Sequence, residues 1–176
     1  MQIEKFDSSL NDETFKSKVN NIFVLLLSSV MNKDIERVDH FISDDVFNKY
    51  KLMIEYLKDK NYIQMYEQLN VKSTEIKNIE KLEDKIVVTV HLVSRALEYI
   101  MDSEKNIVTG NDNTRLEKEY ILTLEKSINV KKQSIARKCP SCGANMDVNY
   151  SGECQYCGTI YNNEDFDYIL TNIKTV

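Results

Sequence analysis

The hydrophobic period of this chain changes once, from the spacing typical of helices to the spacing typical of strands. In residues 12–31 the apolar side chains recur every three or four positions, and similar spacing returns in residues 33–41 and 44–60. After about residue 66 the apolar residues tend to alternate, and residues 85–101 are dense in β-branched and aromatic side chains. Helices followed by long strands predict an α+β fold, in which N-terminal helices pack on one curved antiparallel sheet.

The third helical segment carries the clearest boundary signals. Ser43 is a favourable N-cap residue, and the acids Asp44 and Asp45 follow it at the helix start. Lys58 and Lys60 lie at the other end, where positive charge complements the helix dipole. The inward side chains are predicted to be Val46, Tyr50, Met53, Ile54 and Leu57 in this helix, and Phe15, Val19, Ile22, Phe23, Leu26, Leu27 and Val30 in the first.

The strand region contains one long strand and one expected turn. Residues 85–101 are long for a single strand, so we expect a bulge or bend near residues 94–96. Residues 105–114 are predicted to be a turn region, because Gly, Asn and Asp cluster at its tip. The strand after this turn is expected to carry Tyr120, Leu122 and Leu124 on one face.

The four cysteines of the chain form one pattern, C-x2-C-x11-C-x2-C. They are Cys139, Cys142, Cys154 and Cys157. A two-residue spacing lets both thiolates of a pair reach one ion, and four thiolates close a tetrahedral zinc sphere with no position for water. We therefore expect one structural zinc ion in a ribbon at residues 139–158. A disulfide pair or iron are the alternatives, but nothing in the sequence indicates an oxidising compartment.

The residues after the ribbon are predicted to form a short amphipathic helix. Phe166, Ile169, Leu170 and Ile173 have offsets that place them on one helical face. The expected domain organisation is therefore an α+β domain at residues 1–130, followed at residues 131–176 by a linker, the zinc ribbon and this C-terminal helix.

The charge distribution disfavours nucleic acid as a partner. The formal net charge is −5, and residues 139–176 contain five acids and one base, so the ribbon is a poor partner for phosphate. The adjoining residues 126–138 contain five bases and no acid, and we expect an edge strand and linker there. Nucleic-acid binding stays open as an alternative, through Lys131, Lys132, Arg137 and Lys138.

No segment of the sequence has the length and polarity of a membrane span or a signal peptide. The longest nearly apolar run, residues 22–31, has ten residues, about half of the ~20 that a spanning helix needs. The first 21 residues are polar and mixed in charge, unlike a signal peptide. We expect a cytoplasmic location, with membrane association left open.

Two polar residues share one face of the long strand. His91 and Arg95 lie among Val, Thr and Leu, whereas the opposite face is more uniformly apolar and is the better candidate for the core. We note them as a candidate polar site without an assigned carboxylate. No phosphate-binding Gly loop or nucleophile elbow is present, so we expect a protein that is not an enzyme.

The order of elements resembles the nuclear-transport-factor-2-like cone fold, and more narrowly the domain of the 44-kDa subunit of the mitochondrial inner-membrane translocase (Tim 44-like). The resemblance is carried by "FKSKVNNIFVLLLSSVMNKDIERVDHFISDDVFNKY" and "DKIVVTVHLVSRALEYIMDSEKNIVTGNDNTRLEKEYILTLEKS", with a V-x-G turn at residues 107–110. The stretches "CPSCGA" and "SGECQYCG", with "DYIL" after them, are similar to the zinc ribbon that ends bacterial members.

This resemblance covers about residues 12–176 and implies a non-catalytic binding or adaptor function. It implies a protein partner or membrane lipid, and leaves the oligomeric state open. A small-molecule enzyme of the cone fold and a nucleic-acid-binding zinc ribbon are the alternative functions.

Overall fold

The computed structural model describes residues 2–128, 136–138, 142–147, 156–157 and 168–176 of the 176-residue chain. The helical segments are η1 (Ile3–Lys5), α1 (Asp12–Met31), η2 (Ile35–Phe41) and α2 (Asp44–Asp59). The strands are β1 (Ile63–Lys81), β2 (Lys85–Met101), β3 (Ile107–Gly110), β4 (Leu116–Ser127), β5 (Ala136–Lys138), β6 (Asn145–Asp147) and β7 (Ile169–Thr175).

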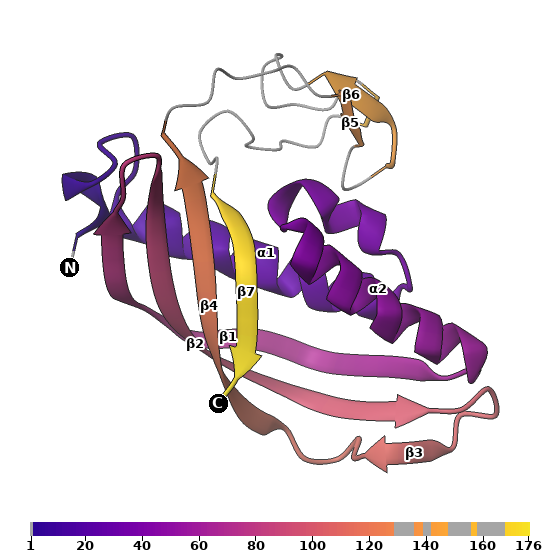
Figure 1. Cartoon of the computed structure of the whole chain (residues 1–176). Helices are drawn as coiled ribbons and strands as arrows, with labels where there is room; N and C mark the ends of the chain where they lie inside the picture. The colour runs from indigo at the N-terminus through magenta and orange to yellow at the C-terminus, as the bar shows by residue number, and fades with distance from the viewer. Residues whose placement is uncertain (1, 129–135, 139–141, 148–155, 158–167) are drawn as a thin grey trace.

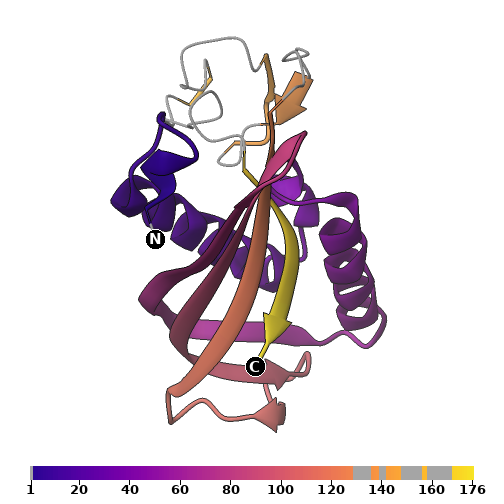
Figure 2. The same ribbon diagram turned by 60° about the vertical axis from the view of Figure 1, so that its left-hand side comes forward.

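The architecture is α+β, as predicted. Five strands form one antiparallel sheet in the order β1-β2-β4-β7, and β3 pairs with the end of β2. The three helical segments α1, η2 and α2 pack on one side of this sheet, which we call the inner face (Figures 1 and 2). The opposite side is the outer face. The C-terminal ends of β2 and β3 and the start of β1 run beneath α2 in Figure 1.

The core lies between α1 and the inner face. Asn11 caps α1 by accepting a hydrogen bond from the Thr14 amide at 2.8 Å. The seven residues of the predicted α1 stripe are all buried, and the ring of Phe23 meets that of Tyr120 edge-on at 4.9 Å. The strand residues that face them, each at most 7% exposed, are Ile86, Val88, Val90, Leu92, Tyr120, Leu122 and Leu124.

The irregularity expected near residues 94–96 is present, but the extra residues belong to the neighbouring strand. The β1–β2 register skips between Glu67 and Asn70, opposite Arg95 to Leu97, while β2 pairs with β4 without a skip. Gln68, inside the skip, has a left-handed backbone with φ 51°. A bulge of this kind bends the strand that carries it and increases the local twist.

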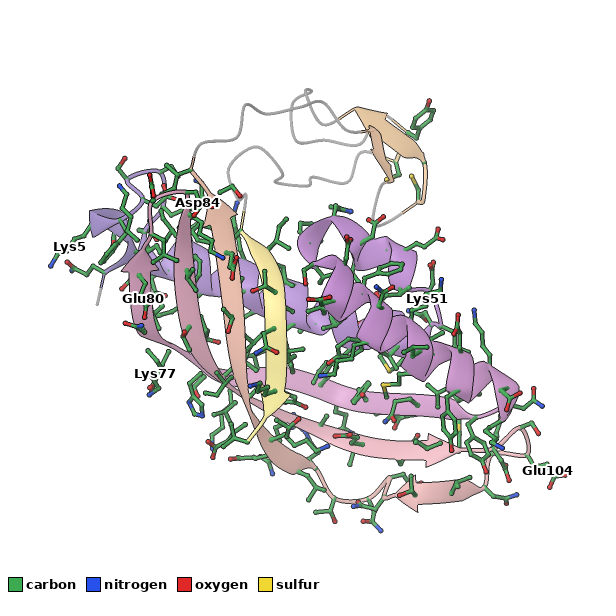
Figure 3. The ribbon with its side chains drawn as sticks, viewed as in Figure 1. Lys5, Lys51, Lys77, Glu80, Asp84 and Glu104 are labelled. Atoms are coloured by element: carbon green, nitrogen blue, oxygen red, sulfur yellow. The ribbon has the colours of Figure 1, made fainter. Side chains whose placement is uncertain are left out.

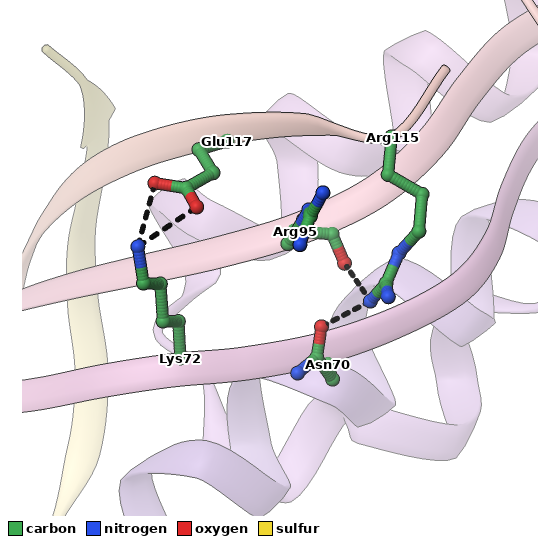
Figure 4. Close-up of polar contacts among 5 residues, drawn as sticks. All are labelled: Asn70, Lys72, Arg95, Arg115 and Glu117. Atoms are coloured by element: carbon green, nitrogen blue, oxygen red, sulfur yellow. Dashed lines mark hydrogen bonds and ion pairs between the residues drawn. The ribbon is translucent and has the colours of Figure 1, made fainter.

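Arg115 holds this bulge in place from the start of β4. Its guanidinium donates to the Gln68 carbonyl at 2.8 Å, to the Asn70 side-chain oxygen, and to the Arg95 carbonyl at 3.4 Å. Figure 4 shows Arg115 reaching across β2 to Asn70 on β1. One side chain therefore joins all three strands at the bend.

The predicted turn region at residues 105–114 is partly a strand, because Ile107–Gly110 pair with the end of β2 as β3. Gly110 has φ 81°, and a Cβ at this position would lie 2.3 Å from the Glu98 carbonyl oxygen. Only glycine fits such a close approach of two backbones. The turn itself follows β3, and the Asn111 side chain accepts from the Thr114 amide at 2.8 Å.

The predicted C-terminal helix is wrong, because residues 169–175 form strand β7 along β4. The buried residues at this end of the chain are Tyr168, Leu170 and Ile173. A regular strand would place successive inward residues two positions apart, but a bulge at Thr171 separates Leu170 and Ile173 by three. That spacing imitates the helical period. The expected boundary between two domains near residue 130 stays a prediction. Strand β7, which follows that boundary in the sequence, pairs within the main sheet.

Asp7 joins the N-terminal segment to the two C-terminal strands of the sheet. Its carboxylate, 8% exposed, accepts from Ser9 Oγ at 2.6 Å, Lys126 Nζ at 2.9 Å and Tyr168 Oη at 3.2 Å. Burial raises the pKa of this carboxyl, but the hydrogen bonds from Ser9 and Lys126 outweigh burial and leave the pKa below its usual value.

Because the folded state binds the ionised form of Asp7 more tightly, this stabilisation is present above the unfolded pKa, near 4, and is lost as pH falls through the lower folded pKa. Asp7→Asn should lower the free energy of unfolding by about 1 kcal/mol at pH 7 and by less at pH 3, measured by urea unfolding. Glu104→Gln, at an exposed turn (Figure 3), is the control. An equal loss of unfolding free energy at both pH values would show that the ionisation of Asp7 does not contribute to stability.

Arg115→Gln should lower the free energy of unfolding by about 1–2 kcal/mol, because the bulge loses donors to two strands. Arg95→Gln is the matched control, since its guanidinium makes no hydrogen bond or ion pair within the described part of the chain. Both are compared by thermal unfolding. If the two variants melt alike, Arg115 does not hold the bend.

Candidate functional site

An ion pair marks the inner face near the bend. Lys118 Nζ lies 2.7 Å from Glu98 Oε2, and the two side chains are 37% and 24% exposed. Glu98 lies opposite Tyr66 on β1, and Lys118 lies opposite Ser94 on β2, so the pair connects two rows of the sheet. A charged pair on an otherwise apolar face is a departure from the pattern that packing alone requires.

Three tyrosines from three elements surround this pair. Tyr50 comes from α2, Tyr66 from β1 and Tyr120 from β4. Tyr120 contributes to raising the pKa of Tyr50, and Tyr50 and Tyr120 both contribute to raising the pKa of Tyr66. Tyr66 and Tyr120 are only 8% and 7% exposed. We call these three residues, with Glu98 and Lys118, the tyrosine cluster.

The phenols of the tyrosine cluster are held in their protonated form. Burial, and then the neighbouring Tyr120, raises the pKa of Tyr50 to about 12. Burial and Glu98 raise the pKa of Tyr120 to about 12, although a hydrogen bond with Ser94 opposes the change. Burial is also the main cause that raises the pKa of Tyr66, followed by Glu98. Protonated phenols can donate hydrogen bonds to a bound group.

The sequence analysis predicted two residues of the tyrosine cluster and missed its charged pair. Tyr50 and Tyr120 are predicted to point inward, and the structure places both there. The missed signal is Glu98, whose even position in β2 assigns it to the same face as Val88, Val90 and Leu92. A lone carboxylate in the alternation of an apolar face indicates a polar site.

On the outer face His91 has a carboxylate partner that the sequence did not assign. His91 Nε2 lies 2.8 Å from Glu119 Oε2 on β4, and the side chains are 20% and 57% exposed. Glu75, directly opposite His91 on β1, is bonded instead to Lys77. The partner was missed because the sequence does not specify the register between β2 and β4.

Arg95, the second residue of the predicted polar site, belongs to a different group on the outer face. It lies in a row with Asn70 on one side and Glu117 on the other. Both oxygens of Glu117 accept from Lys72 Nζ, at 2.8 and 3.0 Å (Figure 4). His91 and Arg95 therefore share a face but have separate surroundings.

The predicted zinc ligands are only partly described. Cys142 and Cys157 are exposed, whereas Cys139 and Cys154 lie outside the described residues. No group of three or more metal-binding side chains is found within the described ranges. Strands β5 and β6 pair with each other, and Gly143, between them in the sequence, has φ 74°.

The remaining sequence expectations concern basic residues and membrane spans. Arg137 and Lys138 lie in β5, while Lys131 and Lys132 are outside the described residues. Within the described part of the chain, no helix combines the length and apolarity needed to cross a bilayer.

Comparison with known proteins gives a family and one distant fold. The crystal structure of the intermembrane space region of the chloroplast protein ARC6 is similar with a TM-score of 0.48 and 6% identity, over 92% of this chain and 95% of that one. No curated protein matches the sequence. Residues 1–134 match the Tim44-like domain. Because this match spans most of the chain and includes the helices and strands β1 to β4 that carry the tyrosine cluster, the chain belongs to the Tim44-like domain family.

Proposed function

We propose that this protein is a non-catalytic binding or adaptor module that holds a protein partner or a membrane lipid at the tyrosine cluster. The observation that carries the proposal is a partly exposed ion pair, Glu98 with Lys118, beside two buried phenols, Tyr66 and Tyr120, and the partly buried Tyr50. Such a surface offers hydrogen-bond donors and both signs of charge beside apolar side chains. Binding sites for lipids and peptides combine a largely apolar lining with a few placed polar groups.

The ionisation of the cluster favours recognition over proton transfer. A general base works best when its pKa lies near the working pH, and the pKa values of these phenols are raised well above that range. Glu98, the carboxylate of the cluster, is already engaged by Lys118 at 2.7 Å. Membership of the Tim44-like domain family also supports a binding function rather than a catalytic one.

Helix α2 also carries exposed apolar side chains, on a different face from Tyr50. Leu52 is 66% exposed and Tyr56 is 53% exposed, one helical turn apart. They continue the face that carries Lys49, which donates to the Ile173 carbonyl of β7 at 3.1 Å.

Binding is tested with the full chain and two changes in the cluster, Tyr66→Phe and Lys118→Gln. Each should weaken association about tenfold, because each removes a donor to the bound group. Native mass spectrometry reports retained lipid, and flotation with phosphatidylethanolamine–phosphatidylglycerol vesicles reports membrane binding. Cross-linking in extracts of its own cells reports a protein partner, provided that the links map to α2 or β4.

Lys51→Gln is the control, because Lys51 projects from the side of α2 away from β1 and β2 (Figure 3). The proposal fails if the wild-type chain retains no lipid, floats with no vesicle and gives no such cross-link. It also fails if both cluster variants bind as tightly as the control.

We further propose that the four cysteines hold one structural zinc ion. Their thiolates supply a complete donor set, and the pairing of β5 with β6 and the positive φ of Gly143 are compatible with a turn around one cysteine pair. The ion would cross-link a segment too short to have a core of its own.

Cys154→Ser should abolish zinc binding and leave the main sheet folded, because β7 is anchored by its own buried residues, Tyr168, Leu170 and Ile173. Native mass spectrometry should give one zinc per wild-type chain, and hydrogen exchange should rise at residues 136–157 but not in β2 or β4. Absence of bound metal, or bound iron, would refute the zinc proposal. Global unfolding of the variant would instead show one cooperative unit.

A further inference from the structure

The Arg95 side chain lies on the outer face of the sheet, at the bend. The side chain is exposed, and among the residues that the structure describes no hydrogen bond or ion pair reaches its guanidinium. Its backbone carbonyl, by contrast, accepts from Arg115. Figure 4 shows the Arg95 side chain on the same side of the strands as Lys72 and Glu117, with the helices behind them.

The nearest carboxylate in this row, Glu117, is shared between two cations, because a hydrogen bond from Lys72 and then the charges of Lys72 and Arg95 lower its pKa. Glu117 lies directly opposite Arg95 on β4, yet Lys72 donates to both of its oxygens. The side chains of Lys72 and Glu117 are 57% and 45% exposed, so this ion pair is a surface pair of small net stability. Lys72 can therefore exchange Glu117 for another carboxylate at little cost.

The second arginine at this position, Arg115, makes no ion pair with the carboxylates that the structure describes. Within the described residues Arg115 donates to neutral oxygens only, from Gln68, Asn70 and Arg95. We call Lys72, Arg95, Arg115 and Glu117 the outer cationic cluster. It contains three cations and one carboxylate, in a chain whose formal net charge is −5.

Other acids on the same face are already engaged. Glu119 lies 2.8 Å from His91, and Glu75 accepts from Lys77 at 2.5 Å. Within the outer cationic cluster, Glu117 therefore compensates only part of the positive charge of Lys72, Arg95 and Arg115. Since Arg115 is tied to the bulge, the residues free to rearrange are Arg95 and Lys72.

We propose that the outer cationic cluster is a docking site for an acidic segment of a partner protein. One carboxylate of the segment binds the planar fork of Arg95 through two hydrogen bonds, and a neighbouring carboxylate binds Lys72. The argument is charge complementarity at a single exposed point of an acidic protein. This site lies on the sheet face opposite the tyrosine cluster and does not depend on the function proposed for that cluster.

A peptide fits these observations better than a nucleic acid. An extended phosphate backbone needs a track of cations, whereas here Glu117 lies within the cluster and Glu119 follows it along β4. The negative charge of the whole protein would also repel a long polyanion. A short acidic segment places only one or two carboxylates at the cluster and avoids both penalties.

The test uses the full chain and a fluorescein-labelled hexaglutamate peptide, with binding followed by fluorescence anisotropy at low and high salt. The wild-type chain should bind the peptide, and added salt should weaken binding. Arg95→Gln should weaken it about tenfold, and Arg95→Lys, which keeps the charge but loses the fork, should fall between. Lys51→Gln, a change of equal charge on α2, should bind like the wild type.

Three results would overturn the proposal. They are no binding of hexaglutamate by the wild-type chain, equal binding by Arg95→Gln, and equally tight binding of an oligothymidine of the same length, which would indicate a general anion site. Because the Arg95 guanidinium makes no hydrogen bond or ion pair among the described residues, and its attraction to Glu117 is a weak surface interaction, Arg95→Gln should keep a melting temperature close to that of the wild type. A weaker-binding variant with unchanged melting therefore reports on docking alone.

Discussion

The bend of the sheet at the β1 bulge is the constraint on which both candidate surfaces depend. Gln68 takes a left-handed backbone there, and Arg115 donates to its carbonyl across β2. Beyond the bend, β1 and β2 run beneath α2, which brings Tyr66 and Glu98 to the neighbourhood of Tyr50. On the other side of the same strands, the bend gathers the outer cationic cluster.

The two faces of β2 have different physical roles. Its inner residues from Ile86 to Leu92 are almost completely buried and supply much of the apolar burial that stabilises the fold. Past the bend, the same face carries Glu98 and lies against buried phenols. Burying polar groups costs free energy unless each finds a partner, and the ion pair of Glu98 with Lys118 limits that cost here.

Much of the fold follows from local pattern, and much of the site does not. The limits of α1, the Ser43 cap of α2 and the limits of β2 agree with the sequence expectations, because caps and periodic burial are local signals. The Glu98–Lys118 and His91–Glu119 pairs were not predicted. Each joins two strands whose register is set by hydrogen bonds over long sequence distances.

The sequence by itself determined where helices and strands lie and which side chains face the core, because burial on one face imposes a period on neighbouring residues. It also determined the set of four cysteines. Only the tertiary structure decided that the last segment is strand β7, since the bulge at Thr171 gives Leu170 and Ile173 a helix-like spacing. It likewise placed the bend, because the left-handed Gln68 is held by an arginine 47 residues away along the chain.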